Sequence, residues 1–482
     1  MNISIEILLL AGSVLLLFSI LLSKTGYRFG VPTLLMFLLA GMIFGTDGVG
    51  IEFDDVHTAQ DIGMAALCII LFSGGLDTKI KSIRPVLWPG LSLSTAGVLL
   101  TTLITGAFVW LVSGSVGAGV AFTPVTAMLL AATMSSTDSA SVFNILRSQK
   151  IMLKHRLGPM LELESGSNDP MAYLLTIILI QCAGTADISG WEIALSFVMQ
   201  FGVGVLGGWL LGRLAVWTVN KVNLRNPELY LIMVLCFIFA IFSSVTLLKG
   251  NGYLAIYIAG IVMGNSDTFR KREIGTFLNG VTWLVQVVMF VLLGLLVNPK
   301  EMLGIAPIGI LAALFMILVA RPASVWLSLL PFGRRISRKS KLFVSWVGLR
   351  GAAPILFATY PVVAGVEAGS EIFNIVFFVT LISLLVQGTT IAKAAQLLGL
   401  SDKDADEADH FGIELPDSID SHLSEMFCTE SMLASGHRLR DLTLSEGQLV
   451  ILVRRGDRYI VPNGRTVLAP GDILLLLSPD HQ

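Results

Sequence analysis

Long apolar runs fill almost all of the first 400 residues, and they constrain the fold more than any other feature of the chain. A helix of about 20 apolar residues crosses the hydrocarbon core of a bilayer, and it satisfies its own backbone hydrogen bonds there. The runs therefore predict an all-α polytopic membrane protein with about 13 transmembrane helices. They lie near residues 5–23, 31–46, 59–77, 87–112, 117–146, 156–183, 190–220, 226–247, 251–266, 272–297, 303–330, 341–364 and 371–398.

The composition excludes other classes of protein. Charged residues make up 14% of the 482 residues and hydrophobic residues 54%, whereas soluble domains carry roughly 25% charged residues. A soluble enzyme is therefore excluded, and a net charge of −2 without a basic stripe argues against a nucleic-acid partner. The four cysteines are scattered without a CxxC pair, which predicts inert thiols and no metal site. The first 22 residues lack a basic leader and a cleavage site, so we expect them to remain as the first membrane helix.

A step in charge density predicts two domains. Residues 1–400 contain 25 Lys/Arg and 19 Asp/Glu, whereas residues 401–482 contain 7 and 15. The first part is thus a transmembrane domain, and the second has the composition of a domain that folds in water.

Basic residues in the predicted loops indicate the orientation. Loops on one side of the predicted bundle contain 20 basic residues, and those on the other contain only Lys249 and Lys300. Because cytoplasmic loops are enriched in Lys and Arg, we expect an external (periplasmic) N-terminus and a cytoplasmic C-terminus.

A polar string interrupts the predicted fifth span. Ser135, Ser136, Thr137 and Asp138 follow one another inside an apolar run. Hydroxyl side chains can replace backbone partners where a membrane helix unwinds, and an ionisable residue inside the membrane is by default a functional-site hypothesis. We therefore predict an unwound segment with Asp138 in the site.

The sixth span carries two adjacent polar stripes just before Pro170. Ser165 and Asp169 are four residues apart and share one helical face, while Glu164 and Asn168 share a neighbouring face. The first stripe offers oxygen ligands to a small hard cation. The second is expected to include a structural ion pair.

The twelfth span contains a buried cation in a breakable helix. Gly348, Gly351 and Pro354 surround Arg350, and a buried arginine needs a buried anion. We expect that anion to be Glu164, with Glu162 as the second candidate, whereas Arg321 is expected to reach the membrane surface.

The fifth and twelfth spans are seven helices apart, so they run in opposite directions through the membrane. Interrupted helices at matching places in two halves indicate an inverted-repeat transporter. Residues 5–183 and 226–398 would be the repeats, and the crossed broken helices would bring Asp138 and Asp169 together near the midplane.

These spans resemble the monovalent cation:proton antiporters of the NhaP type, in the potassium/proton branch linked to cell-volume regulation and pH homeostasis. The resemblance rests on LFSGGL (71–76), STDSASVF (136–143), ESGSNDP (164–170) and GLRGAAP (348–354), in that order on those spans. It implies a homodimer in the bacterial inner membrane, with a dimer domain and a mobile core domain.

The resemblance also implies roles for individual residues. Asp169 would bind the cation and protons in turn, and Ser165 and the Thr137 carbonyl would help to ligate the cation. Asn168 stands where electrogenic relatives have a second acid, which implies electroneutral exchange. Asp138 would belong to the unwound crossing, and Glu164 and Arg350 would form the structural salt bridge. Ser73 is expected among the ion-binding residues, but it stands where many members have a carboxylate, so the secondary cation ligand and the ion selectivity would differ here.

The tail resembles the C-terminal lobe of potassium-conductance regulator domains. Residues 438–478 alternate in the manner of strands, and Asn463-Gly464 and Pro470-Gly471 are turn signals. A small α+β unit of this kind would bind a small-molecule ligand or clamp a dimer. NAD binding is not predicted, because no GxGxxG segment precedes it.

The mechanism that we expect needs one carboxylate in a low-dielectric site and neither enzyme chemistry nor an organic cofactor. Empty and ionised, Asp169 would be costly to move through an apolar barrier, so it would move only when a proton or a cation neutralises it.

The function that we expect from this mechanism is exchange of K⁺ for H⁺, with Na⁺/H⁺ exchange as the first alternative. A gated cation channel is a second alternative, although no TVGYG-like filter is present. A symporter for a small organic anion would require an exposed midplane arginine, which Arg350 would supply if it were not paired with Glu164.

Overall fold

The computed structural model divides the chain into two compact units. It describes residues 5–28, 32–51, 53–114, 121–149, 151–184, 189–333, 335–402, 421–430, 432–433, 436–442, 444, 448–456 and 458–479. The first unit comprises Met1–Gln149 and Leu153–Leu400, and the second comprises Lys150–Met152 and Ser401–Gln482.

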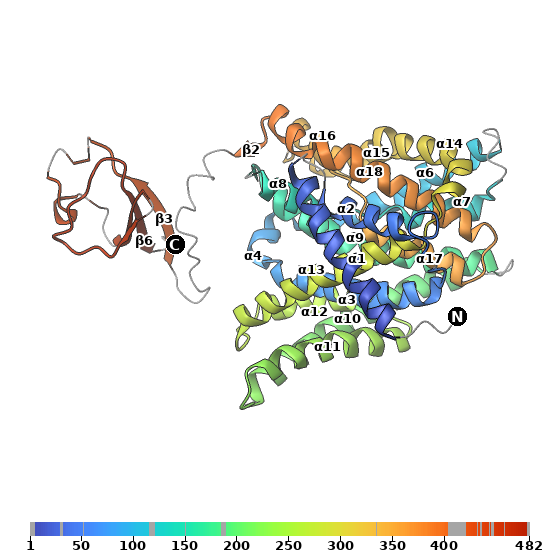
Figure 1. Ribbon diagram of the computed structural model, residues 1–482, viewed down its shortest axis with the longest axis horizontal. Coiled ribbons are helices and arrows are strands. Elements are labelled where there is room, and N and C mark those ends of the chain that lie inside the picture. The colour runs from blue at the N-terminus through green and yellow to red at the C-terminus, as the bar shows by residue number, and fades with distance from the viewer. Residues whose placement is uncertain are drawn as a thin grey trace. The chain divides into compact units, whose positions relative to one another are not determined.

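The first unit is a helical bundle, in which helices far apart in the sequence pack against one another (Figure 1). Up to residue 184 it contains α1 (Ile5–Arg28), α2 (Thr33–Phe44), α3 (Val56–Asp77), α4 (Ile80–Ile83), the 3₁₀ turn η1 (Arg84–Val86), α5 (Leu87–Ser92), the π-helical η2 (Leu93–Gly97), α6 (Val98–Ser113), α7 (Pro124–Thr133), α8 (Ser139–Ser148) and α9 (Leu157–Gly184). It continues with α10 (Gly190–Lys221), α11 (Glu228–Leu247), α12 (Gly252–Gly264), α13 (Lys271–Leu295), α14 (Pro299–Phe315), the π-helical η3 (Met316–Ala320), α15 (Arg321–Ser328), the 3₁₀ turn η4 (Leu330–Phe332), α16 (Arg338–Trp346), α17 (Ala352–Val363) and α18 (Gly369–Leu397).

The bundle is apolar on its outside as well as inside. Among the described residues, seven helical segments are long and apolar enough to cross a membrane, and shorter apolar helices such as α2, α7, α12 and α17 accompany them. The outer face of α10 exposes Trp191, Leu206, Leu210 and Trp217. A large exposed apolar surface of this kind needs a bilayer around it, so the prediction of a polytopic helical membrane protein is confirmed.

Two helix pairs approach closely through glycines placed in the same way. Gly75 of α3 faces Gly260 of α12, and Gly41 of α2 faces Gly294 of α13. A Cβ on any of the four glycines would collide with a carbonyl oxygen of the facing helix. In every case this carbonyl belongs to the residue three positions before the opposite glycine. Small residues at such contacts let membrane helices pack backbone to backbone.

Two spans are broken near their middle, as their polar and glycine-rich strings predict. The helix is interrupted at residues 134–138 between α7 and α8, and again at residues 347–351 between α16 and α17. Asp138 caps α8 by accepting a hydrogen bond from the Ser141 amide at 3.0 Å. A side-chain cap replaces the partner that the interrupted helix no longer provides.

Two further spans contain a π-helical stretch. The segments η2 and η3 lie in spans that pack together, where Thr101 donates to Ser324 Oγ at 2.8 Å and Ser92 donates to the Ser328 carbonyl at 2.8 Å. A π-helical turn widens the helix locally and is frequent at functional sites.

The second unit contains a four-stranded antiparallel sheet in the order β3-β6-β4-β5; β3 and β6 are labelled in Figure 1. Its strands are β3 (Ser421–Phe427), β4 (Leu449–Arg455), β5 (Arg458–Ile460) and β6 (Ile473–Pro479), with the short 3₁₀ turn η6 (Leu439–Asp441). The two-residue strands β1 (Met152–Leu153) and β2 (Ser401–Asp402) pair separately. Gly471 has a φ of +88° in the predicted Pro-Gly turn, a conformation that glycine adopts without strain.

Candidate ion-binding site

The two broken helices meet at their unwound segments. The Asp138 amide donates to the Leu349 carbonyl at 2.8 Å, and Arg350 Nη1 donates to the Ser136 carbonyl at 2.5 Å. A Cβ on Gly351 would collide with the Asp138 carboxylate, so only glycine permits this approach. Each unwound segment thus satisfies backbone groups that the other leaves free.

Helix α9 places Asp169 against this crossing. The Ser136 hydroxyl hydrogen-bonds to Asp169 Oδ1, and the Asp169 side chain is buried at 9% exposure. Pro170 follows directly and lacks a backbone N–H, so the helix is locally weaker here. The predicted proximity of Asp169 to the Ser-Ser-Thr-Asp string is therefore present in the structure.

The other polar residues of α9 tie it to the same break. Ser165 donates to the Thr137 carbonyl at 2.8 Å and accepts from the Ser139 amide at 3.0 Å. Asn168 Nδ2 donates to Thr137 Oγ1 at 2.5 Å. Side chains on two adjacent faces of α9, those of Ser165, Asn168 and Asp169, thus bond the segment from Ser136 to Ser139, which fixes the position of α9 relative to the crossing.

A cavity of about 100 Å³ lies beside these groups. Asp138, Thr137, Ser165 and Asp169 line it with Ser136, so the unwound segment and α9 supply oxygen atoms from both sides. Hard cations prefer oxygen ligands, and carbonyl and carboxylate oxygens can replace part of a hydration shell. Among the described residues, no cluster of three or more His, Cys, Asp or Glu side chains suits a resident metal ion.

The predicted salt bridge between Glu164 and Arg350 is wrong. Glu164 Oε1 lies 2.6 Å from Arg321 Nη2, and the two side chains are only 2% and 4% exposed. The prediction that Arg321 reaches the membrane surface is therefore also wrong. The helix of Arg321 packs against α16, whose Val344 carbonyl accepts a hydrogen bond from Arg321 at 3.4 Å, so the guanidinium stays inside the bundle.

Arg350 is itself 1% exposed and bonds the unwound backbone instead of a carboxylate. It does not belong to the lining of the cavity. The exposed midplane arginine that an anion symporter requires is therefore not provided by Arg350.

Ser73 also departs from the prediction. Its hydroxyl is directed to Asn279 Oδ1 of α13 at 3.4 Å, and Ser73 does not line the cavity, although its neighbour Gly74 does. Successive residues of a helix point about 100° apart, which explains how one of them faces the cavity and the other does not.

The polar residues Glu162, Tyr257 and Gln286 also line the cavity. Sequence reasoning named Glu162 only as a possible partner of Arg350 and did not single out the other two. Glu162 Oε1 accepts from the Thr78 hydroxyl at 3.4 Å, so it faces α3 and is no partner of Arg350. A polar residue within an apolar span was the available signal for Tyr257 and Gln286, but neither lies in a polar string.

A polytopic helical protein in which two broken helices cross beside buried carboxylates has the architecture of a secondary transporter. The comparisons with known proteins make the class specific.

The chain belongs to the sodium/hydrogen exchanger family. The family model "Sodium/hydrogen exchanger, transmembrane" matches residues 13–396, and a TrkA-C domain matches residues 429–482. The K(+)/H(+) antiporter NhaP2 of Shewanella sp. strain MR-4 is 40% identical over 99% of this chain and 82% of its own length. The K(+)/H(+) antiporter NhaP of Alkalimonas amylolytica is 39% identical over 82% of this chain and 68% of its own length.

A solved structure shares the fold of the helical unit. The sodium proton antiporter MjNhaP1 of Methanocaldococcus jannaschii at pH 8 superposes with a TM-score of 0.68, covering 80% of this chain and 97% of that one at 22% identity. The predicted family and transport class are thus confirmed. The protein is a membrane antiporter that exchanges a monovalent cation for protons.

Proposed function

We propose that the protein exchanges K⁺ for H⁺, and that the two ions compete for Asp169. The observation that carries the proposal is the placement of the Asp169 carboxylate against Ser136, at the break between α7 and α8 and on an oxygen-lined cavity. The relatives that are 40% and 39% identical are named K(+)/H(+) antiporters, which favours potassium over sodium.

The exchange follows from the cost of a buried charge. An ionised Asp169 without a counter-ion is unfavourable in the bundle interior. A proton on the carboxylate removes that charge, and a bound K⁺ compensates it with help from Ser136, Ser165 and the Thr137 carbonyl. Only these two neutral forms move between the faces of the membrane, so one ion enters for each ion that leaves.

The exchange is electroneutral in this proposal. Asn168 contributes an amide where a second carboxylate would add a charge, and this amide bonds Thr137 instead of an ion. A potential-sensitive dye should therefore show no membrane potential developing during turnover. A potential that grows with transport would contradict a stoichiometry of one to one.

We further propose thirteen membrane crossings arranged as inverted repeats, with α10 as the linker. If broken and π-interrupted helices are counted as single crossings, the breaks fall in crossings five and twelve and the π segments in crossings four and eleven. The glycine pairs support the same symmetry. Crossing two, which carries Gly41, corresponds to crossing nine, which carries Gly260, seven crossings later. In the same way crossing three, with Gly75, corresponds to crossing ten, with Gly294.

This arrangement puts the N-terminus outside the cell, and the tail in the cytoplasm of a bacterium with the bundle in its inner membrane. Homodimeric assembly belongs to the same proposal, with the TrkA-C domain as a dimer clamp or as a site for a small ligand. Labelling of single cysteines introduced at the exposed Val49 and at Asp267 from either side of the membrane tests the topology. Mass photometry of the purified protein tests the dimer.

Proton flux in vesicles tests the transport proposal. Purified protein in liposomes with an internal pH dye should move protons when external K⁺ is added, and the responses to Na⁺, Rb⁺ and Li⁺ rank the cations. Asp169→Asn should abolish the exchange while the protein remains folded. Glu228→Gln, which removes an exposed acid at the start of α11, is the control.

Two outcomes would contradict the proposal. Near-normal exchange by Asp169→Asn would remove the carboxylate from the mechanism. Collapse of a K⁺ gradient without proton movement would instead indicate a channel.

A further inference from the structure

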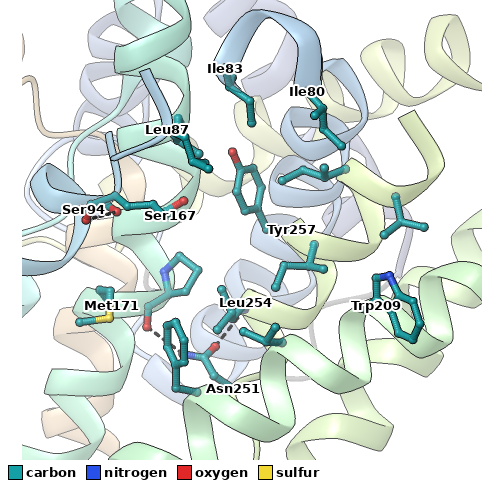
Figure 2. A pocket seen from close by; sticks show the side chains of 18 of the residues that line it. Ile80, Ile83, Leu87, Ser94, Ser167, Met171, Trp209, Asn251, Leu254 and Tyr257 are labelled. Atoms are coloured by element: carbon teal, nitrogen blue, oxygen red, sulfur yellow. Dashed lines mark hydrogen bonds between the residues drawn. The ribbon is translucent and has the colours of Figure 1, made fainter. Parts of the chain in front are cut away.

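A second, larger cavity of about 730 Å³ lies against another face of α9. It is bounded by α4, α5 and η2, by α9, and by α10 and α12, and we call it the lateral crevice. Figure 2 shows Tyr257 and Leu254 of α12 on one side of it and Ser167 and Met171 of α9 on the other. Its volume lies within the range of about 300–1,000 Å³ that is usual for small-molecule sites.

The lateral crevice is long and mostly apolar. Its lining follows α12 from Asn251 to Asn265, a length of about 20 Å at the helical rise. Leucine, isoleucine and valine side chains form most of the wall between these two asparagines. A cavity of this length and polarity suits an extended hydrocarbon chain.

The two ends of the crevice differ in charge. Asn220 of α10 bonds the Asp267 carbonyl at 2.7 Å, and the Ile80 amide donates to Asn265 at 2.8 Å. The C-terminal ends of α10 and α12 and the segment at Ile80 therefore lie together. Arg84 and Arg213 both line the crevice in the half that belongs to this end.

The two arginines have no carboxylate partner within the part of the chain that the structure describes. Arg213 instead stacks on Trp209, with 4.8 Å from its guanidinium carbon to the ring centroid. Guanidinium groups bind phosphate with two parallel hydrogen bonds, and tryptophan favours the interface between headgroups and acyl chains. In the orientation proposed above, on which this inference rests, this end lies at the cytoplasmic surface, where anionic lipids attract basic residues.

We propose that the lateral crevice binds one anionic phospholipid, with its phosphate at Arg84 and Arg213 and an acyl chain along α12. The lipid would lie between α9, which carries Asp169, and the neighbouring α10 and α12. Tyr257 lines both the crevice and the ion cavity, so the two sites share a wall. The site thus gives a lipid of defined headgroup charge direct contact with the helix of the ion site.

Native mass spectrometry of the full chain tests the site without any measurement of transport. The wild type should retain phosphatidylglycerol in preference to phosphatidylcholine. Arg84→Gln/Arg213→Gln should weaken phosphatidylglycerol retention about 30-fold, since each basic residue contributes about fivefold at an anionic surface. Lys221→Gln/Arg225→Gln removes the same charge near the same end of α10 outside the crevice and should leave retention unchanged.

A second pair of variants tests the acyl-chain part. Val205→Trp fills the crevice and should expel the lipid, whereas Leu206→Trp on the exposed face of the same helix should not. Asp169→Asn should retain lipid like the wild type, so failure of the transport proposal would not affect this result. The proposal is overturned by equal retention in the two double variants, by equal retention of phosphatidylcholine, or by displacement with inorganic phosphate, which would indicate a phosphate site without a lipid.

Discussion

At the scale of single residues, the two aspartates of the cavity are distinguished by their partners. The Asp138 carboxylate accepts hydrogen bonds from the Ser141 amide at 3.0 Å and the Ser141 hydroxyl at 2.5 Å, so it is held as a helix cap. Asp169 is bonded by the side chain of Ser136. A hydroxyl can reorient between donating to a carboxylate and presenting its oxygen to a cation, which favours Asp169 over Asp138 as the acid that exchanges ligands in the proposed mechanism.

Ser136→Ala is expected to raise the KM for the transported cation about tenfold and to leave the protein stable. The variant removes one of the proposed oxygen ligands, and tenfold corresponds to about 1.4 kcal/mol. Cation titrations of proton flux in liposomes measure the effect. Ser135→Ala is the control, because the Ser135 hydroxyl bonds the Ala132 carbonyl of the adjoining helix at 2.7 Å; an equal change in both variants would exclude a specific role for Ser136.

Arg321→Gln is expected to destabilise the protein by about 3–5 kcal/mol, because it leaves the buried Glu164 without its counter-charge. Thermal unfolding followed by size-exclusion chromatography in detergent measures the loss. The double variant Arg321→Gln/Glu164→Gln removes both charges and should recover most of the stability. A double variant as unstable as the single one would mean that the ion pair is not the cause.

At the scale of secondary structure elements, the site depends on two helices that stop and restart. Apolar residues on both sides of each break keep α7, α8, α16 and α17 inside the bundle, while the unwound residues bond across the crossing. Such irregular backbone is tolerated in a membrane only where protein partners satisfy it. The polar strings in the sequence therefore serve two purposes: they supply the bonds of the crossing, and they line the proposed ion site.

Gly351→Ala is expected to abolish exchange, because the added methyl group collides with Asp138 and forces the crossing apart. We expect the rest of the bundle to fold, with a destabilisation of about 1–3 kcal/mol from the overpacked contact. Proton flux and thermal unfolding measure the two effects. Gly202→Ala on α10 meets no neighbouring atom and should behave like the wild type; normal exchange by Gly351→Ala would show that the close approach is not needed.

At the scale of the whole molecule, each unit is stabilised by the forces that its solvent allows. The bundle packs backbone to backbone at its glycine pairs and exposes apolar faces to lipid. The C-terminal sheet instead encloses a small core that includes Leu433, Val453 and Leu474. Beside this core Arg455 holds Asp472 with two hydrogen bonds of 2.6 and 2.8 Å.

The C-terminal sheet is expected to lose stability as the pH falls below about 4. Burial alone would raise the pKa of Asp472, but the hydrogen bonds from Arg455 and the Ala469 amide outweigh it and hold the pKa below its ordinary value of about 3.9. Because the pKa is lower in the folded state than in the unfolded state, the Asp472 carboxylate stabilises the fold at every pH above its unfolded-state pKa. This stability is lost as the pH falls and the carboxylate is protonated.

Hydrogen exchange of β4 and β6 in the full-length protein measures that loss. Asp472→Asn should already show faster exchange at pH 7, with about 2 kcal/mol less protection. Its exchange should also depend less on pH below 5 than that of the wild type. An unchanged acid dependence in the variant would assign the transition to other carboxylates.

Much of the architecture could be predicted because apolar length and loop charge act locally. The helix breaks at Asp138 and Arg350 and the stripe of Ser165 and Asp169 are all visible as short strings, and the structure brings these strings together. The partner of Glu164 could not be predicted, since two arginines lay in apolar spans and only packing decides which one a carboxylate meets. The surroundings of Ser73 could not be predicted either, because the packing of α3 against α13 decides whether its side chain faces the cavity or Asn279.

By itself the sequence determined that residues 1–400 form a polytopic helical bundle in a membrane, because a bilayer penalises polar groups that lack a partner, and the resemblance carried by its polar strings indicated the transport class. Only the tertiary structure decided that Arg321 neutralises Glu164, that Ser136 bonds Asp169, and that a crevice with two arginines runs along α12. These are contacts between segments far apart in the sequence, such as Ile80 and Asn265, which are 185 residues apart. Their choice depends on how whole helices pack, and no local preference of the chain encodes it.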